Sequence, residues 1–293
     1  MAPALFLMGV GPMARWRKAG AIDLAKRLRW AAAVSLAAAL LAPLLLGHWT
    51  PMIGFGLLLA AWIASTAALN LFTRLRDHPA TGLAQRLRAQ PGSYYGMLLA
   101  HFGVAVFIVG VTIVGGYAVE KDVRMEPGDT VQVGGYVFRL ERMSERRGPN
   151  YTAIRATLSV TDNGRALTEL NPERRVYTVT RTPLTETAID RGFTRDLYVA
   201  LGEPVSANAW GIRVYYKPMV GWIWSGCLLM ALGGLLAVLD RRYRAARKTV
   251  AERAPSAVPG TSSMAQPALL ASAAGGVAKA GIAGATATGA TAR

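Results

Sequence analysis

The sequence is poor in the residues that usually carry redox and metal chemistry. It holds one cysteine, Cys227, and three histidines among 293 residues. A single cysteine excludes an intramolecular disulfide, and without a Cys-x-x-Cys motif the chain offers no thiol redox pair. We therefore interpret Cys227 as a small apolar side chain within a helix.

Acidic residues are also few, with 17 Asp and Glu against 33 Lys and Arg. The resulting net charge of +16 is not spread evenly. Basic residues gather in 15–29, 74–88 and 241–253, whereas 118–220 is nearly balanced, with 15 basic and 13 acidic side chains. This is the positive-inside pattern of a membrane protein. It predicts cytoplasmic basic loops and an outer segment 118–220, and we expect no nucleic-acid partner.

Charged side chains are absent from four long apolar runs. A helix needs about 20 apolar residues to cross a bilayer. We therefore predict transmembrane helices over Trp30–Gly47, Met52–Phe72, Tyr94–Tyr117 and Gly221–Leu239. A fifth run, Ala2–Met13, is too short to cross alone and has no basic region before it, so it is a poor signal peptide. We expect it to be the second half of a helix that begins outside this chain.

The outer segment has the pattern of short strands. Residues 129–133 and 136–140 flank Gly134-Gly135 and predict a hairpin, and Tyr151–Thr161 ends at the turn signal Asn163-Gly164. Further strands are expected over Arg175–Thr182, Arg195–Ala200 and Gly211–Tyr216, which gives five or six in all. The predicted fold class is an α-helical integral membrane bundle with an inserted small antiparallel β domain, either a barrel or a sandwich.

These patterns divide the chain into six parts. The predicted parts are a partial helix and basic cytoplasmic segment (1–29), three transmembrane helices (30–117), a periplasmic β domain (118–220), a transmembrane helix (221–239), a basic cytoplasmic end (240–253) and a tail (254–293). The tail is rich in Ala, Gly, Ser and Thr and is expected to be disordered.

His101 is the one ionisable side chain within the third predicted membrane helix. Such groups are costly in hydrocarbon and usually serve a function. The alternative is a histidine that hydrogen-bonds to another helix. The other two histidines, His48 and His78, are expected in loops.

Several long strings resemble the last part of the cytochrome c-type biogenesis proteins of the CcmF family. The likeness runs from about Leu5 to Arg244 and excludes the tail. It rests on GMLLAHFGVAVFIVG at 96–110, NPERRVY at 171–177, TETAIDRGFTRDLYV at 185–199, VYYKP at 214–218 and MALGGLLA at 230–237.

The resemblance implies a multi-pass subunit of the cytochrome c haem lyase in the bacterial inner membrane. Such a subunit takes haem from a haem chaperone, delivers it to apocytochrome c, and holds its own b-type haem between two membrane histidines. His101 matches the second of these and is thus the predicted axial ligand of the haem iron. We expect its other ring nitrogen to donate to a carbonyl or hydroxyl group.

The resemblance also implies that this chain is incomplete. The tryptophan-rich WWD segment and the other haem histidine belong to the earlier half of the family's sequence, and neither is present here. We expect a split subunit or a truncated copy that is inactive as a haem lyase alone. Its expected partners are the missing amino-terminal part, the haem chaperone, the apocytochrome-handling subunits, apocytochrome c and membrane lipid.

Two further features have open interpretations. Arg191 and Arg195 suit haem propionates, because a guanidinium fork matches a carboxylate; the alternative is solvated loop charge. A cluster of aromatic side chains precedes and enters the last predicted helix, and it is either an interfacial belt or a surface for a porphyrin. The cluster comprises Trp210, Tyr215, Tyr216, Trp222 and Trp224. For the whole chain, the alternatives are a haem-free structural scaffold and a functionless gene fragment.

Overall fold

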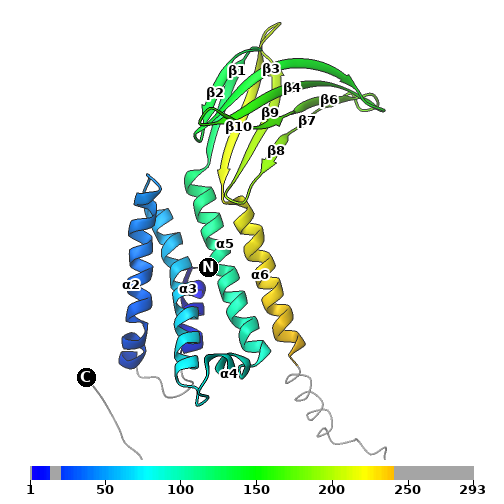
Figure 1. Cartoon of the computed structure of the whole chain (residues 1–293). Helices are drawn as coiled ribbons and strands as arrows, with labels where there is room; N and C mark the ends of the chain where they lie inside the picture. The colour runs from blue at the N-terminus through cyan, green and yellow to red at the C-terminus, as the bar shows by residue number, and fades with distance from the viewer. Residues whose placement is uncertain (1, 14–20, 241–293) are drawn as a thin grey trace, which may run out of the picture. The chain divides into compact units, whose positions relative to one another are not determined.

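The computed structural model describes residues 2–13 and 21–240 (Figure 1). Its helices are α1 (Ala2–Val10), α2 (Ala21–Leu45), α3 (Pro51–Arg76), α4 (Leu83–Arg88), α5 (Gly92–Tyr117) and α6 (Val220–Leu239). Residues Gly11–Met13 add one turn of 3-10 helix after α1. The predicted tail 254–293 and nearly all of the basic end 240–253 lie outside the described residues.

Helices α2, α3, α5 and α6 are each long and apolar enough to cross a membrane. The four predicted spans are therefore present. Helix α2 differs most from its prediction, because it begins at Ala21 rather than at Trp30. Lys26, Arg27 and Arg29 are good helix formers, so the helix extends beyond the apolar run.

Local signals fix the start of α3. The Thr50 hydroxyl accepts a hydrogen bond from the Ile53 amide at 3.3 Å, and Pro51 occupies the first helical position.

Helix α1 packs against the middle of α3. The Trp62 indole donates to the Phe6 carbonyl at 3.0 Å, and their rings stack with centroids 4.9 Å apart. The short apolar run thus forms a helix that rests on α3.

Glycines bring α5 and α6 into close contact. Gly96, Gly103 and Gly110 recur every seven residues on α5 and face backbone atoms of α6. A Cβ atom at Gly103 would lie 2.7 Å from the Met230 nitrogen, and one at Gly226 would lie 2.6 Å from the Phe107 nitrogen. Small residues at such spacing permit close helix packing within a membrane.

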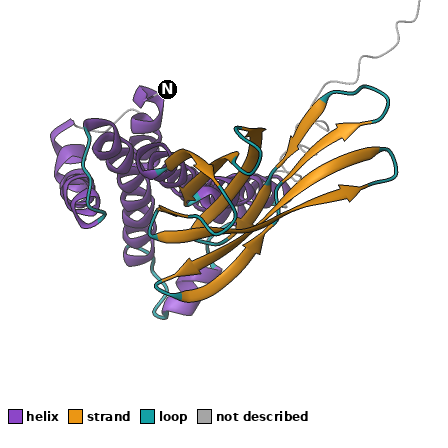
Figure 2. Ribbon diagram, turned by 90° about the horizontal axis from the view of Figure 1, so that it is seen from above, coloured by secondary structure: helices purple, strands orange, loops and turns teal. Residues whose placement is uncertain are grey.

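The segment between α5 and α6 forms ten strands in two sheets (Figure 2). One sheet has the order β1-β10-β9-β8; the other has the order β2-β3-β4-β6-β7, with β5 paired to β4. The strands are β1 (Val119–Met125), β2 (Thr130–Val133), β3 (Tyr136–Arg147), β4 (Tyr151–Asp162), β5 (Arg165–Leu170), β6 (Glu173–Tyr177), β7 (Pro183–Glu186), β8 (Ala188–Arg191), β9 (Arg195–Pro204) and β10 (Trp210–Pro218).

The two sheets pack as a sandwich around one apolar core. Phe138, Leu158, Leu197 and Ile212 are among its fully buried side chains and come from strands of both sheets. The predicted hairpin is present, with Val133 opposite Tyr136 across Gly134-Gly135. Both glycines have positive φ angles, 59° and 87°, as a two-residue hairpin turn requires.

The strand prediction was wrong in number and at several strand ends. Strand β3 continues to Arg147 and β9 to Pro204, beyond the predicted ends at Leu140 and Ala200. Ten strands replace the expected five or six, because β1, β5, β7 and β8 had not been predicted. The predicted strand Arg175–Thr182 ends at Tyr177, where the chain turns before β7. Arg181 in this turn has a positive φ of 52°. A left-handed residue at this point is incompatible with a continuous strand.

The sandwich is joined to the membrane helices at two adjacent points. Helix α5 leads into β1 after Ala118, and β10 leads into α6 through Met219, whose φ is 57°. The Met219 amide donates to the Thr194 carbonyl at 2.9 Å, which joins this turn to the β8–β9 connection. All described residues belong to one compact unit.

Candidate functional site

His101 lies in the first half of α5 and is half-buried. Its Nδ1 atom is 2.8 Å from the carbonyl oxygen of Met97, one turn earlier. A carbonyl can only accept, so Nδ1 carries a proton, and in the neutral ring Nε2 keeps its lone pair. This carbonyl is the kind of partner expected for the ring, and metal-binding histidines commonly donate their second nitrogen in this way.

The face of α5 that carries His101 is turned away from α6. Ala105, one turn later, packs with Trp62 and Ile63 of α3. Residues four apart share a helix face, so His101 belongs to the side that faces α3. Gly103, which contacts α6, lies on the opposite side of the helix. A ligand on His101 would therefore lie on the α3 side of α5.

The other histidines are remote from His101. The Tyr117 hydroxyl donates to the His48 carbonyl, which places His48 beside the last residue of α5. Tyr117 is sixteen residues after His101, or about 24 Å along the helix at 1.5 Å per residue. His78 follows α3, which ends at Arg76, and its Nδ1 accepts from the Ala80 amide at 3.2 Å. It thus belongs to the connection that leads to the start of α5 at Gly92, and His101 is nine residues, or about 14 Å, further along α5. The chain can thus bring one histidine to this depth.

The two predicted arginines have different environments in the sandwich. Arg195 donates to the Asp190 carboxylate at 2.5 Å and lies over the Tyr136 ring at 5.1 Å. Burial would lower the pKa of this guanidinium, but hydrogen bonds to Asp190 and Tyr136 outweigh that effect and raise the pKa. Its side chain is 13% exposed, and its N–H groups bond to other residues of the sandwich. Arg191 is exposed.

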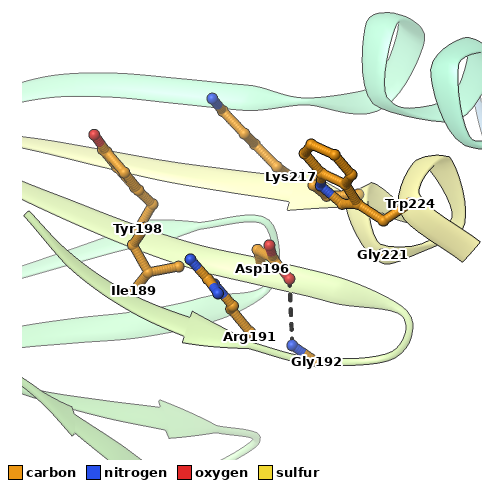
Figure 3. Close-up of a pocket in the computed structure, with 9 residues that line it drawn as sticks. Ile189, Arg191, Gly192, Asp196, Tyr198, Lys217, Gly221 and Trp224 are labelled. Atoms are coloured by element: carbon orange, nitrogen blue, oxygen red, sulfur yellow. Dashed lines mark hydrogen bonds between the residues drawn. The ribbon is translucent and has the colours of Figure 1, made fainter.

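Arg191 lines a pocket of about 510 Å³ where the sandwich meets α6 (Figure 3). Strands β8, β9 and β10 and the first turns of α6 form its walls. The lining side chains come from two stretches of the sequence, 189–198 and 217–224, which only the fold brings together. The polar and aromatic members are Arg191, Asp196, Tyr198, Lys217 and Trp224.

His101 and the arginines are not brought together. Helix α6 begins beside Gly110, which is nine residues beyond His101, or about 14 Å along α5. The arginines lie in the sandwich beyond that point, while His101 faces α3. The histidine and the arginine pocket are therefore two separate sites. Among the described residues, no group of three or more potential metal ligands occurs.

The aromatic cluster is divided between the sandwich and α6. Trp210 is 9% exposed and belongs to the sandwich core, so it is not part of an interfacial belt. Tyr216 stacks with Tyr136, with ring centroids 5.9 Å apart. Only Trp222 and Trp224 lie in the first turns of α6.

Together, the four membrane-length helices and the sandwich between the last two define a multi-pass membrane protein with an inserted β domain. Residues 116–218 match the family model described as the CcmF C-terminal beta-sandwich. The chain is 41% identical over 251 residues to a cytochrome c-type biogenesis protein CcmF of Pseudomonas aeruginosa, covering 85% of this chain and 37% of the relative. It is 42% identical over 264 residues to CcmF of Escherichia coli K12, covering 88% of this chain and 38% of that relative.

The fold has a counterpart among solved structures. A structure described as cytochrome c heme lyase CcmF superimposes with a TM-score of 0.63 at 22% identity, over 82% of this chain and 38% of that one. The chain corresponds to the carboxy-terminal part of the CcmF family of cytochrome c-type biogenesis proteins. It spans less than two fifths of the length of these relatives.

Proposed function

We propose that this chain is a membrane component of cytochrome c haem ligation in which His101 supplies one axial ligand to a b-type haem. The observation that carries the proposal is the hydrogen bond of the His101 ring. Its Nδ1–H donates to the Met97 carbonyl, which leaves Nε2 to coordinate a metal. When bound, the haem would supply a redox-active iron. The hydrogen bond to Met97 would hold the ring in one tautomer and one orientation.

The second axial ligand would come from another chain. Neither His48 nor His78 lies near the depth of His101. The chain also corresponds to only part of its relatives' length. We therefore propose that the second histidine lies outside these 293 residues. The haem chaperone, the apocytochrome-handling subunits and apocytochrome c are further proposed partners, and the chain alone is proposed to lack lyase activity.

The proposed setting is the bacterial inner membrane with the sandwich in the periplasm. The support is the distribution of basic residues: Arg74, Arg76, Arg86 and Arg88 lie around α4, at the end of α5 opposite the sandwich. A periplasmic sandwich would be placed where apocytochrome c is matured. The propionate role of Arg191 and Arg195 stays a prediction. If it holds, it concerns a haem other than one on His101, because the two sites are separate.

A haem spectrum of the assembled complex tests the axial ligand. The chain would be co-expressed with the missing amino-terminal part and purified from membranes. We expect His101→Ala to remove the low-spin haem-b signal while the membrane level of the chain stays largely unchanged. His48→Ala and His78→Ala are matched controls and should retain the signal.

Chemical rescue separates ligation from packing. In His101→Gly, added imidazole should restore the low-spin signal if the side chain's role is to supply a nitrogen to iron. An unchanged haem signal in His101→Ala would show that the histidine is a packing residue. In that case the haem-free scaffold would be the better description of the chain.

A further inference from the structure

We propose that the pocket between the sandwich and α6 binds the phosphate of an anionic membrane phospholipid, with the lipid's acyl chains lying along the exposed face of α6. This proposal does not depend on haem binding at His101. It rests on three features of the described structure: unpaired cations in the pocket, the position of the pocket at the start of a membrane helix, and an apolar stripe that continues from it.

Two cations lie in one row across three neighbouring strands. Arg191 of β8 pairs in register with Asp196 of β9, which pairs with Lys217 of β10. Side chains paired in this way point to the same face of a sheet. The Asp196 carboxylate accepts a hydrogen bond from the Gly192 amide at 3.3 Å. Within the described residues, neither Arg191 nor Lys217 forms an ion pair. Two cations and one carboxylate leave the row with one excess positive charge.

Lys217 is held in place by aromatic rings. Its ammonium lies 4.9 Å from the centroid of the Tyr215 ring and 5.6 Å from that of Tyr198. A cation over aromatic faces keeps its hydrogen-bond donors free for an anion. Figure 3 shows Lys217 and Arg191 on different strands, with Trp224 reaching toward them from α6.

The pocket lies where the chain enters the membrane. Val220 and Gly221 are the first residues of the apolar helix α6, and both line the pocket. Lys and Arg at this level attract anionic headgroups, and indole rings favour the same depth. The pocket volume of about 510 Å³ lies within the usual range of small-molecule sites.

An apolar stripe descends α6 from the pocket. Trp224, Leu228 and Leu232 are all more than half exposed and follow one another at intervals of four residues, so they share one face. Leu235 and Leu239 continue the same face to the end of the helix. An amphiphile with a charged head in the pocket would lay its chains on this stripe. A free phosphate ion would use only the cations.

A propionate is the competing anion for the same arginine. A haem on His101 would lie on the α3 side of α5, whereas the pocket is bounded by α6, which packs on the opposite side. In a membrane, lipid surrounds α6 along its length. A lipid therefore does not have to extend from the α3 side of α5 to the pocket. The geometry therefore favours a lipid phosphate over the propionate of a haem at His101.

Lipid binding to the purified full chain in detergent tests the proposal. The probe is dioctanoyl phosphatidylglycerol, with binding measured by native mass spectrometry. Each neutralising variant, Arg191→Gln and Lys217→Gln, should weaken binding about fivefold, and the double variant about 25-fold, as expected for two cations near an anionic headgroup. Arg191→Lys and Lys217→Arg keep the charge and should bind within about twofold of the parent chain.

Matched controls distinguish the sources of the anion. Arg165→Gln removes an exposed arginine from β5, outside the pocket, and should leave binding unchanged. Dioctanoylglycerol, which lacks the phosphate, should bind more weakly than the phospholipid and show no dependence on Arg191. Equal binding by parent and double variant would overturn the proposal. Displacement of the lipid by an equal concentration of inorganic phosphate, or by haem in a manner that depends on Arg191, would also overturn it.

Discussion

Gly103 of α5 and Gly226 of α6 approach each other so closely that neither can carry a side chain without displacement. A Cβ atom on Gly226 would lie 2.7 Å from the Gly103 oxygen, and one on Gly103 would lie 2.8 Å from the Gly226 oxygen. Because α5 carries His101 and leads into the sandwich, while α6 leaves it, this contact helps to set the histidine helix relative to the sandwich.

Adding one methyl group at this contact should loosen the helix pair. We expect Gly226→Ala to lower the free energy of unfolding by about 1–3 kcal/mol, the usual range for overpacking a close contact. Gly234→Ala is the matched control on the same helix, because its Cβ would meet no atom within 4 Å. Thermal unfolding of the purified chain in detergent would measure both. Equal melting temperatures for the two variants would contradict the close packing.

A buried carboxylate in β6 organises the arginines of the larger sheet. Glu173 is 3% exposed and accepts hydrogen bonds from Arg155 at 2.7 Å and from Arg175 at 2.9 Å. Burial alone would raise the pKa of Glu173, but the arginine contacts outweigh it and hold the pKa below its ordinary value of 4.5. The folded sandwich thus prefers the charged carboxylate.

Replacing this carboxylate should destabilise the sandwich at neutral pH. We expect Glu173→Gln to lower its free energy of unfolding by about 2 kcal/mol, since hydrogen bonds to a charged group are lost. A carboxylate with a lowered pKa adds stability above its unfolded pKa, and that stability is lost as the pH falls through the folded value. The difference between parent and variant should therefore shrink below about pH 4.5. Urea unfolding at several pH values would measure it, and a pH-independent difference would refute the charge-based explanation.

Sequence patterns predicted the parts of this fold whose signals are local. Each membrane helix is a run of about 20 apolar residues, and the Gly134-Gly135 turn lies directly between its two strands. Strand β1 was not predicted, because its sequence VEKDVRM is mostly charged and exposed. It becomes a strand by pairing with β10, about 90 residues later. Pairing over such a distance leaves no signal in the sequence of β1 itself.

The same distinction applies to the candidate sites. His101 could be found because one ionisable residue interrupts an apolar run. Arg191 could be named from the sequence, but its neighbours Lys217 and Trp224 reach it only after β8, β9, β10 and α6 have come together. Arg195 is near Arg191 in the sequence, yet its guanidinium forms an ion pair with Asp190. Only the fold decides which of two similar arginines faces a pocket.

Reporter fusions should place the sandwich and the basic segments on opposite sides of the membrane. Gly164 lies in the turn between β4 and β5, where an insertion interrupts no strand. A periplasm-active reporter at Gly164 should give high activity, and the same reporter after Arg253 should give low activity, because basic loops stay in the cytoplasm. A cytoplasm-active reporter should give the reverse pattern. The same side for both positions would contradict the proposed orientation.

The chain alone should fail to mature cytochrome c. It has one histidine at membrane depth, and its length corresponds to 37–38% of its relatives. We expect no holocytochrome c when the chain is expressed in a strain that lacks the whole family member, as measured by haem staining of membrane and periplasmic fractions. Co-expression with the missing amino-terminal part should restore maturation. The chain must be detected in the membrane in both cases, so that failure reflects an absent partner rather than an absent protein. Maturation by this chain without a partner would show that it holds a complete ligation site and would overturn the proposal that the second histidine lies outside these 293 residues.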